Sequence, residues 1–216
     1  MIRVLLVDDH AILREGLGAL LNEQSDIEIV GEASDGRTAI DMVRTLAPDV
    51  VVMDVGMPDL NGIDATKRIR SEHPRARVIA LSTHTDERYV QHMLEAGACG
   101  YVLKIAAYDE LLRAVRAASQ GRTYLSSESA GGVVDRALHG GGVTDATTGV
   151  KLGTREREVL QLVAEGKTSA EAAKAMHISI KTVETHRRNI VLKLDLHGTA
   201  ELTKYAIREG LTSVEP

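Results

Sequence analysis

Polar side chains follow four short apolar segments in the first half of the chain. Three carboxylates crowded together raise one another's pKa and repel unless a cation joins them. A set of oxygen donors without His or Cys suits a hard ion, above all Mg²⁺. One acid alone would indicate little, whereas complementary groups after four segments predict an acidic Mg²⁺ site beside a hydroxyl and an ammonium group. These residues are, in chain order, Asp8 and Asp9, Asp54, Ser82, and Lys104.

The segments that carry these residues alternate with helical patterns. Short runs of β-branched and aliphatic residues favour strands, and Leu13, Leu17 and Leu20 recur at helical spacing after the first run. Such alternation predicts a doubly wound (βα)₅ α/β fold, in which a parallel sheet is covered on both faces. Sites in such sheets lie at the carboxyl ends of the strands, so the polar residues should meet at one edge. We expect strands at 2–7, 27–30, 50–53, 78–81 and 99–103, with helices at 38–46, 63–72, 86–96 and 109–120.

The composition excludes several classes of protein. The chain has 216 residues, of which 44% are apolar, enough for one or two domains with aliphatic cores. Aromatic residues are 2%, with no Phe and no Trp, which argues against a platform of stacked rings for single-stranded nucleic acid. The single cysteine, Cys99, rules out an intramolecular disulfide and a multi-cysteine zinc site. Without a long apolar run we expect no membrane segment and a cytoplasmic protein.

Composition also predicts where the chain divides. The stretch 126–150 holds six of the 19 glycines, which is typical of a connector. We therefore expect a first domain at 1–125, a Gly-rich linker at 126–150 with a short helix near 133–138, and a second domain at 151–216. The first part is acidic and the last mildly basic, which suggests modules with different partners.

The last part has the pattern of a small all-α domain. Four helices are expected at 154–165, 169–176, 180–194 and 199–208, and the short turn between the second and third fits a helix-turn-helix. On a helical wheel, the third helix has an apolar face formed by Ile180, Val183, Ile190 and Leu194. Its opposite face is polar toward the N-terminal half, where a recognition helix meets base edges. That face holds Lys181, Glu184, Thr185 and Arg188.

Residues 2–121 resemble the receiver domain of two-component response regulators of the NarL/FixJ type. The resemblance is carried by VDDH, VVVMDVGMPDLNG and GYVLK at matching spacings. It implies a flavodoxin-like receiver in which Asp54 is the phosphoacceptor and a sensor histidine kinase is the phosphoryl donor. It further implies that Asp9, Asp54 and the Gly56 carbonyl ligate Mg²⁺ and that Asp8 holds the ion through water.

The same resemblance assigns roles to three residues around the phosphoryl group. Lys104 would pair with one phosphoryl oxygen and the Ser82 hydroxyl would donate to another. Tyr101 stands at the aromatic switch position and would turn inward after phosphorylation. His84, two residues after Ser82, is expected together with Gly56 to affect how quickly the phosphoryl group is lost.

Residues 152–211 resemble the LuxR-type helix-turn-helix, through SIKTVETHRRNIVLKL and the segment before it. The resemblance implies a transcription regulator that binds double-stranded promoter DNA, as a homodimer when phosphorylated, and that is not an enzyme. Glu184, Thr185 and Arg188 are then candidates for base contact. Lys181, Thr182 and Val183 are candidates for contact with the sugar-phosphate backbone, which supplies most of the affinity.

Three positions depart from the usual pattern of this helix-turn-helix. Gly153-Thr154 replaces the usual Thr-Pro at the first helix, so its cap should be shifted or weakened. Ala172 replaces a larger apolar residue and fills less of the core. Asp195 replaces a glycine after the recognition helix, where a left-handed conformation is common. These changes predict lower stability for the free domain.

Three other functions remain open at this point. A Mg²⁺-dependent phosphatase with an aspartyl nucleophile would need a second acid two residues after Asp54, where this chain has Gly56. A flavin or nucleotide module would need a glycine-rich loop after the first strand, where the chain has Asp8-Asp9-His10. A ligand-gated LuxR-type regulator would not need the intact acidic site.

Overall fold

The structure is a computed structural model that describes residues 1–105, 108–126 and 152–212. The chain forms two compact units, one from the N-terminal part and one from the C-terminal part, and each is described by itself. Of the linker expected at 126–150, only Ser126 is described: it is buried, and its N–H donates to the Tyr101 carbonyl at 3.1 Å. The remainder, with the helix expected near 133–138, lies outside the described residues. In the described part of the chain, no helix is long and apolar enough to cross a membrane.

The first unit contains a parallel sheet of six strands in the order β2-β1-β3-β4-β5-β6. Residues that alternate along β1 face opposite sides, and both sides are buried, as parallel sheets require. The strands are β1 (Ile2–Val7), β2 (Ile27–Ala33), β3 (Val50–Asp54), β4 (Arg77–Ser82), β5 (Gly100–Leu103) and β6 (Tyr124–Leu125).

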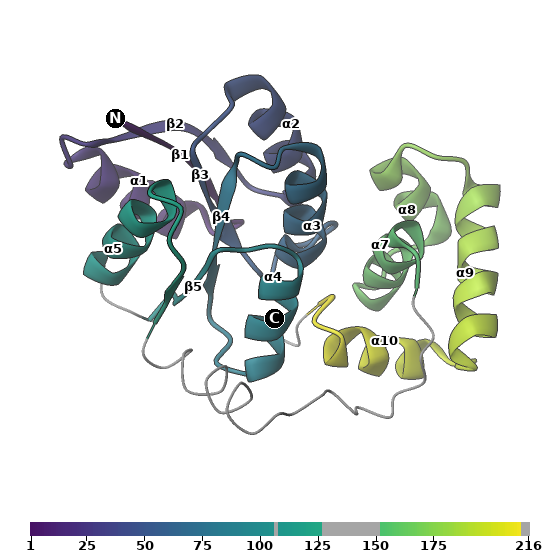
Figure 1. Cartoon of the computed structure of the whole chain (residues 1–216). Coiled ribbons are helices and arrows are strands. Elements are labelled where there is room, and N and C mark those ends of the chain that lie inside the picture. The colour runs from purple at the N-terminus through teal and green to yellow at the C-terminus, as the bar shows by residue number, and fades with distance from the viewer. Residues whose placement is uncertain (106–107, 127–151, 213–216) are drawn as a thin grey trace. The chain divides into compact units, whose positions relative to one another are not determined.

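Helices cover both faces of this sheet, with α1 and α5 on one side and α2, α3 and α4 on the other (Figure 1). The core is aliphatic: Val4 and Val52 of the sheet pack with Leu21 of α1 and Leu111 of α5, all at most 2% exposed. The doubly wound α/β fold predicted from the sequence is confirmed. The helices are α1 (Ala11–Asn22), α2 (Gly36–Leu46), α3 (Gly62–Glu72), α4 (Glu87–Glu95) and α5 (Tyr108–Ser119).

The sixth strand was not predicted. Tyr124 and Leu125 pair in parallel with Gly100 and Tyr101 of β5. Two residues are too few to show a periodicity, so β6 is set by its neighbour in the sheet and not by a local pattern. Gly100 allows the close pairing, because a Cβ there would lie 3.0 Å from the Tyr124 carbonyl oxygen.

In its described residues, the second unit is a bundle of four helices around its own core. The helices α8, α9 and α10 have the predicted bounds, and α7 ends one residue earlier than predicted. Val159, Leu160 and Leu162 of α7 are fully buried, as their spacing predicts. The bounds are α7 (Thr154–Ala164), α8 (Ser169–Met176), α9 (Ile180–Leu194) and α10 (Thr199–Arg208).

Ile180 does not lie in the core as the helical wheel predicted, since it is 52% exposed. The wheel places it on the same side as Val183 and Ile190, which are at most 2% exposed. However, Ile180 is the first residue of α9, and side chains of a helix lean toward its N-terminus. Its side chain therefore lies beyond the residues that pack in the core.

At the three positions that depart from the usual helix-turn-helix pattern, the local structure accommodates the residue that is present. Gly153 is the N-cap of α7 and offers no side-chain acceptor, but the Glu156 carboxylate accepts its backbone N–H at 2.7 Å. Asp195 ends α9 in the left-handed conformation, with φ of 53°, which Asp tolerates better than most residues. Ala172 is fully buried in α8.

Candidate functional site: an acidic pocket and a recognition helix

The carboxyl ends of β1, β3, β4 and β5 bring the predicted pocket residues to one edge of the sheet. Asp8 follows β1 directly, Asp54 ends β3 and Lys104 follows β5. Asp8 and Asp54 are 2% and 3% exposed, so the two carboxyl groups lie inside the edge of the sheet. The backbone N–H of Lys104 donates to the Ser82 carbonyl at 2.7 Å, which fixes the start of the lysine side chain.

Lys104 joins the two buried carboxylates. Its Nζ lies 2.8 Å from Asp54 Oδ2 and 2.9 Å from Asp8 Oδ2. The lysine side chain is itself only 9% exposed, so all three charges share a site largely withdrawn from water. One ammonium group thus faces two carboxylates. The pocket keeps a net negative charge, which favours the binding of a cation.

The pKa values of Asp54 and Lys104 are both raised, for different reasons. Burial raises the pKa of Asp54 to about 6, and the neighbouring charge of Asp8 adds to the rise, while Lys104 opposes it. For Lys104, burial disfavours the ammonium form, but the two carboxylates outweigh burial and raise its pKa. The lysine is therefore a fixed positive charge, and Asp54 is the group whose charge is costly.

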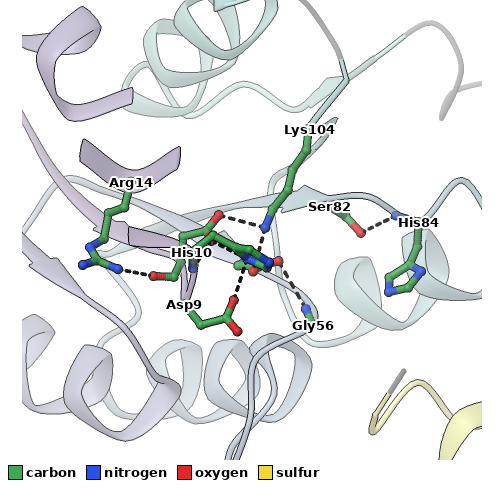
Figure 2. A network of polar contacts seen from close by, with 9 residues as sticks. Asp9, His10, Arg14, Gly56, Ser82, His84 and Lys104 are labelled. Carbon is green, nitrogen blue, oxygen red and sulfur yellow. Dashed lines mark hydrogen bonds and ion pairs between the residues drawn. The ribbon is translucent and has the colours of Figure 1, made fainter. Parts of the chain in front are cut away.

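Asp9 lies at the open side of the cluster, with a side chain 28% exposed. His10 contacts both acids before it: its Nδ1 is 2.9 Å from Asp9 Oδ1 and 3.2 Å from Asp8 Oδ1 (Figure 2). Arg14 of α1 donates to the Asp8 carbonyl at 2.6 Å and to Glu32 at 3.1 Å, which holds the turn after β1 in place.

His10 and Arg14 were missed by sequence reasoning. His10 directly follows the acid pair, and this adjacency was the signal that could have identified it. Arg14 lies one turn further along α1, and only the three-dimensional structure shows that its side chain reaches back to the Asp8 carbonyl. Both residues contact the acidic turn after β1, although neither was among the strand-end residues from which the pocket was predicted.

The loop after β4 is tied to the pocket by two hydrogen bonds at His84. The backbone N–H of His84 donates to Ser82 Oγ at 3.0 Å, and the Tyr101 hydroxyl donates to the His84 carbonyl at 2.8 Å. The His84 ring stacks on Tyr89 of α4, with ring centres 4.1 Å apart. The imidazole lies beside the loop after Asp54, because a Cβ on Gly56 would be 3.7 Å from its Nε2.

Tyr101 is buried, with no exposed surface, and burial raises its pKa to about 12. The ring thus lies inside the protein, and the prediction that it turns inward after phosphorylation stays a prediction. Its position on β5 and its hydroxyl bond to the loop explain this placement.

The loop between Asp54 and α3 is held by hydrogen bonds. The backbone N–H of Gly56 donates to Asp54 Oδ1 at 3.3 Å, and that of Gly62 donates to the Val55 carbonyl at 3.0 Å. Asn61 caps α3, because its side chain accepts the backbone N–H of Asp64 at 2.8 Å. These contacts hold the Asp54 carboxylate at the start of a short, fixed loop.

The donor set of the pocket fits a hard divalent cation. Asp9 Oδ1 is buried, and its polar contact in the structure is with His10 Nδ1 at 2.9 Å. One ligand atom from each of Asp8, Asp9, His10 and Asp54 lies within 4.8 Å of the others. Carboxylate oxygens gathered in this way match the ligands that Mg²⁺ prefers, and Gly56 beside Asp54 is exposed.

In the second unit, α8 and α9 form the predicted helix-turn-helix. His177 ends α8 in the left-handed conformation, and Ser179 caps α9 by accepting the Thr182 N–H at 3.1 Å. Exposed side chains then occur along the N-terminal half of α9, as a recognition helix requires. They belong to Lys181, Thr182, Glu184, Thr185 and Arg188.

Val183 lies apart from these candidates for DNA contact. It has no exposed surface and packs in the core of the second unit. Its place on the inner face of α9 argues against the predicted contact with the sugar-phosphate backbone. The carboxylate of Glu184 contacts the Ser169 hydroxyl at the start of α8, and this contact restricts where the glutamate can point.

Comparison with known proteins identifies both units. Residues 4–116 match the response regulator receiver domain, and residues 150–206 match the bacterial regulatory proteins of the luxR family. The chain belongs to the response regulators. It is therefore a transcriptional response regulator of the two-component type with a DNA-binding unit, and the phosphatase and ligand-gated alternatives are not supported.

Relatives cover nearly the whole response regulator. It is 44% identical to the transcriptional regulatory protein LiaR of Bacillus subtilis, over 99% of this chain and 100% of that protein. It is 37% identical to the oxygen regulatory protein NreC of Staphylococcus haemolyticus, over 97% of this chain and 98% of that protein.

Solved structures of response regulators are similar to this chain over most of its length. The regulator is similar to the RcsB response regulator of Salmonella typhimurium, at 27% identity and a TM-score of 0.58, over 94% and 97% of the two chains. A second RcsB structure is bound to the promoter rprA in the presence of phosphomimetic BeF₃⁻, at 28% identity and a TM-score of 0.56, over the full length of both chains.

Proposed function

We propose that this response regulator accepts a phosphoryl group on Asp54 from a histidine of a sensor kinase and thereby changes its binding to promoter DNA. The observation that carries the proposal is the pocket at the strand ends, where Lys104 bridges Asp54 and Asp8 beside Asp9. The solved relative bound to a promoter with a phosphomimetic supports the link between the pocket and DNA.

The phosphoryl step follows from the positions of the side chains. A carboxylate oxygen of Asp54 attacks the phosphorus of the donor phosphohistidine, the P–O bond forms as the P–N bond breaks, and the imidazole leaves with the bonding electron pair. Asp9, Asp54 and the Gly56 carbonyl would hold Mg²⁺. When bound, the ion neutralises charge on the phosphoryl oxygens.

Lys104 and Ser82 then receive the new group. The lysine ammonium is already within 2.8 Å of Asp54 and can follow a phosphoryl oxygen as a point charge. The Ser82 hydroxyl accepts a hydrogen bond from the His84 N–H and keeps a proton of its own, which it can donate to a phosphoryl oxygen. The phosphoryl group adds about −1.5 to −2 of charge, which strengthens both contacts.

A movement of Ser82 in the pocket would be transmitted to the loop after β4 through His84. If Ser82 moves toward the phosphoryl group, the His84 N–H that it accepts must move or lose its partner. The Tyr101 hydroxyl, held on the His84 carbonyl, then loses or shifts its anchor as well. We propose that the switch is a rearrangement of this loop around a tyrosine that is already buried.

Intact mass measurement after incubation with acetyl phosphate and Mg²⁺ tests the phosphoacceptor. The wild-type chain should gain one phosphoryl group, and Asp54→Asn should gain none because the amide is not a nucleophile. Asp59→Asn, a nearby acid outside the cluster, is the matched control and should be phosphorylated as the wild type is. Phosphorylation of Asp54→Asn at a comparable rate would show that the assignment is wrong.

The second unit supplies the DNA contacts. We propose that Arg188, Glu184 and Thr185 face base edges from the major groove, and that Lys181 and Thr182 contact the phosphate backbone. The Thr185 hydroxyl donates to the Lys181 carbonyl at 2.9 Å, so the threonine presents its methyl group outward. That methyl suits the apolar edge of thymine.

Two substitutions on α9 separate base contact from phosphate contact. Arg188→Ala should relax the preference for one base in each half-site and cost roughly 1–3 kcal/mol of binding free energy. Lys181→Ala should weaken binding to all sequences and lower the salt dependence by about one unit of slope. Selection from random DNA and binding titrations at several salt concentrations measure both. Identical effects of the two substitutions would contradict the proposed division.

We further propose that the regulator acts as a homodimer when phosphorylated, in the cytoplasm, where its DNA lies. A dimer would read two half-sites about one helical turn apart. Loss of its own phosphoryl group, influenced by His84 beside Gly56, is the reaction that we expect the regulator to promote, and we propose no enzymatic activity toward other substrates. His84→Ala should change the half-life of the acyl phosphate, and an unchanged half-life would refute this role.

A further inference from the structure

Helix α9 carries a large apolar side chain that does not join the core of the second unit. Leu192 lies in the last turn of the helix and is 73% exposed. It follows Val183 by nine residues and Ile190 by two, and both of these are at most 2% exposed. At about 100° per residue, these spacings place Leu192 about half a turn of the helix away from each of them. Its side chain therefore points away from the core.

The polar candidates for DNA contact share a face of α9 with this leucine. Leu192 follows Arg188 by four residues, Thr185 by seven and Lys181 by eleven, spacings at which side chains lie above one another on a helix. All four side chains are exposed. The two cations attract phosphate groups to this face. DNA that binds there is therefore brought against the leucine as well.

The major groove offers one kind of apolar group to such a side chain. Base edges there carry hydrogen-bond donors and acceptors, and the apolar exception is the C5-methyl group of thymine. Leucine has neither donor nor acceptor in its side chain, so covering a polar edge would remove water from that edge without replacing its hydrogen bonds. Contact with a thymine methyl would instead remove apolar surface of both partners from water. The chemistry of Leu192 thus selects thymine among the bases.

We infer that Leu192 reads a thymine in each half-site through the C5-methyl group of that base. The inference rests on the proposed function in that α9 must lie along the major groove. Thr185 presents its own methyl group from the same face, because its hydroxyl donates to the Lys181 carbonyl at 2.9 Å. The seven residues from Thr185 to Leu192 span about 10.5 Å of helix axis, or about three base pairs at 3.4 Å each. The regulator therefore reads two thymine methyls up to about three base pairs apart.

A plainer role for Leu192 predicts a different result. Single exposed apolar side chains are common on protein surfaces and need no partner. Leu192→Ala would then bind every DNA sequence as the wild type does. A leucine that contacts another protein would give this same result in a titration with DNA alone. A loss of affinity that depends on one thymine methyl therefore separates the inferred role from both.

Replacement of thymine by deoxyuridine tests the contact at a single methyl group. Deoxyuridine pairs with adenine as thymine does but lacks the C5-methyl. The full chain, treated with acetyl phosphate and Mg²⁺, first selects its half-site from random duplexes. Each thymine of the selected duplex is then replaced in turn, and its affinity for wild type, Leu192→Ala and Leu192→Met is measured by titration.

Thr185→Ser is the matched control for these variants, because it removes the other methyl group of the face and keeps the hydroxyl. The double-mutant cycle between each protein variant and each deoxyuridine measures the coupling of that side chain to that base. Leu192 is exposed, so its substitution should leave the fold intact, and circular dichroism verifies this.

At one thymine, deoxyuridine should lower the affinity of the wild type about fourfold per half-site, the factor that corresponds to burial of one methyl group. Leu192→Ala should bind the thymine duplex more weakly and lose its response to that replacement, whereas Leu192→Met should keep the response. Thr185→Ser should also keep it and lose the response at a different thymine.

An equal response to deoxyuridine in wild type and Leu192→Ala would overturn the inference, as would a wild type that responds at no position or a selected half-site without thymine. Each of these outcomes leaves DNA binding by α9 intact. A chain that binds none of the duplexes would instead contradict the proposed function, and the inference would fail with it.

Discussion

Gly62 leaves no room for a side chain behind the carbonyl group of Asp54. A Cβ at this position would lie 2.0 Å from the Asp54 carbonyl oxygen and 2.9 Å from its carbon. Both atoms belong to the backbone and cannot rotate away as a flexible side chain could. Any substitution must therefore displace the residue that carries the proposed phosphoacceptor.

Gly62→Ala should destabilise the first unit by on the order of 1–3 kcal/mol, the usual cost of overpacking. Gly16→Ala is the matched control, because no atom lies within 4 Å of a Cβ there and alanine favours helix α1. That variant should be stabilised by roughly 0.5–1 kcal/mol. Urea denaturation followed by circular dichroism measures both, and equal stability of the two variants would contradict the steric account.

The raised pKa of Asp54 predicts how stability depends on pH. Its pKa is about 6 in the folded protein against an ordinary value of 3.8, so the folded state binds the proton more tightly than the unfolded state. Stability should therefore fall as pH rises from about 4 through about 6 and then level off. In EDTA, Asp54→Asn should stabilise the protein at pH 8 by on the order of 1–3 kcal/mol and have little effect at pH 4.

Thermal denaturation of wild type and variant at several pH values tests this sign. Asp41→Asn, whose side chain is exposed, serves as the control and should change stability by no more than about 0.5 kcal/mol at any of them. A loss of stability for Asp54→Asn at pH 8 would show that its pair with Lys104 outweighs the cost of burial.

At the scale of helices and strands, local patterns predicted most of the fold. The ends of α9 follow from Ser179, an N-cap, and from the loss of the apolar period after Leu194. Strand β6 and the exposure of Ile180 depend on neighbours in space, which no local pattern contains. The same holds for the pocket: strand ends revealed Asp54 and Lys104, whereas the contacts of His10 appear only in three dimensions.

An ion pair between Glu156 and Lys193 joins helices α7 and α9. The Glu156 carboxylate lies 2.7 Å from Lys193 Nζ and also accepts the Gly153 N–H. Burial opposes the carboxylate, but Lys193 and the Gly153 N–H outweigh burial, so the pKa of Glu156 is lowered. A lowered pKa contributes stability above about pH 4.5, and this contribution is lost as pH falls through the folded value.

Glu156→Gln should destabilise the second unit at pH 7 by on the order of 1 kcal/mol, and the difference from wild type should shrink as the pH falls below about 4.5. Glu201→Gln is the matched control, because Glu201 accepts the Gly198 N–H at 3.1 Å in the same way but has no lysine in ion-pair distance among the described residues. Hydrogen exchange of the α7 and α9 amides provides the measurement. Equal effects of both substitutions would mean that the link to Lys193 contributes nothing.

At the scale of the whole chain, two separate cores predict two folding units. One core surrounds the sheet and the other lies between α7, α8, α9 and α10. Fragments 1–126 and 150–216 should each unfold cooperatively when expressed alone, and the second should melt at the lower temperature. It is small and fills its α8 positions with Ala172 and Ala173, which bury little surface. An unfolded second fragment in NMR spectra would show that it depends on the first.

The tyrosines give this response regulator a built-in optical signal. It has five Tyr and no Trp, so its intrinsic fluorescence comes from tyrosine alone. Two of the five, Tyr101 and Tyr89, contact His84 through a hydroxyl bond to its carbonyl and a stacked ring. A rearrangement of the loop at His84 would alter the quenching of both rings at once. Emission near the tyrosine maximum should therefore follow phosphorylation in real time without any added dye, and Tyr101→Phe should lose part of that signal.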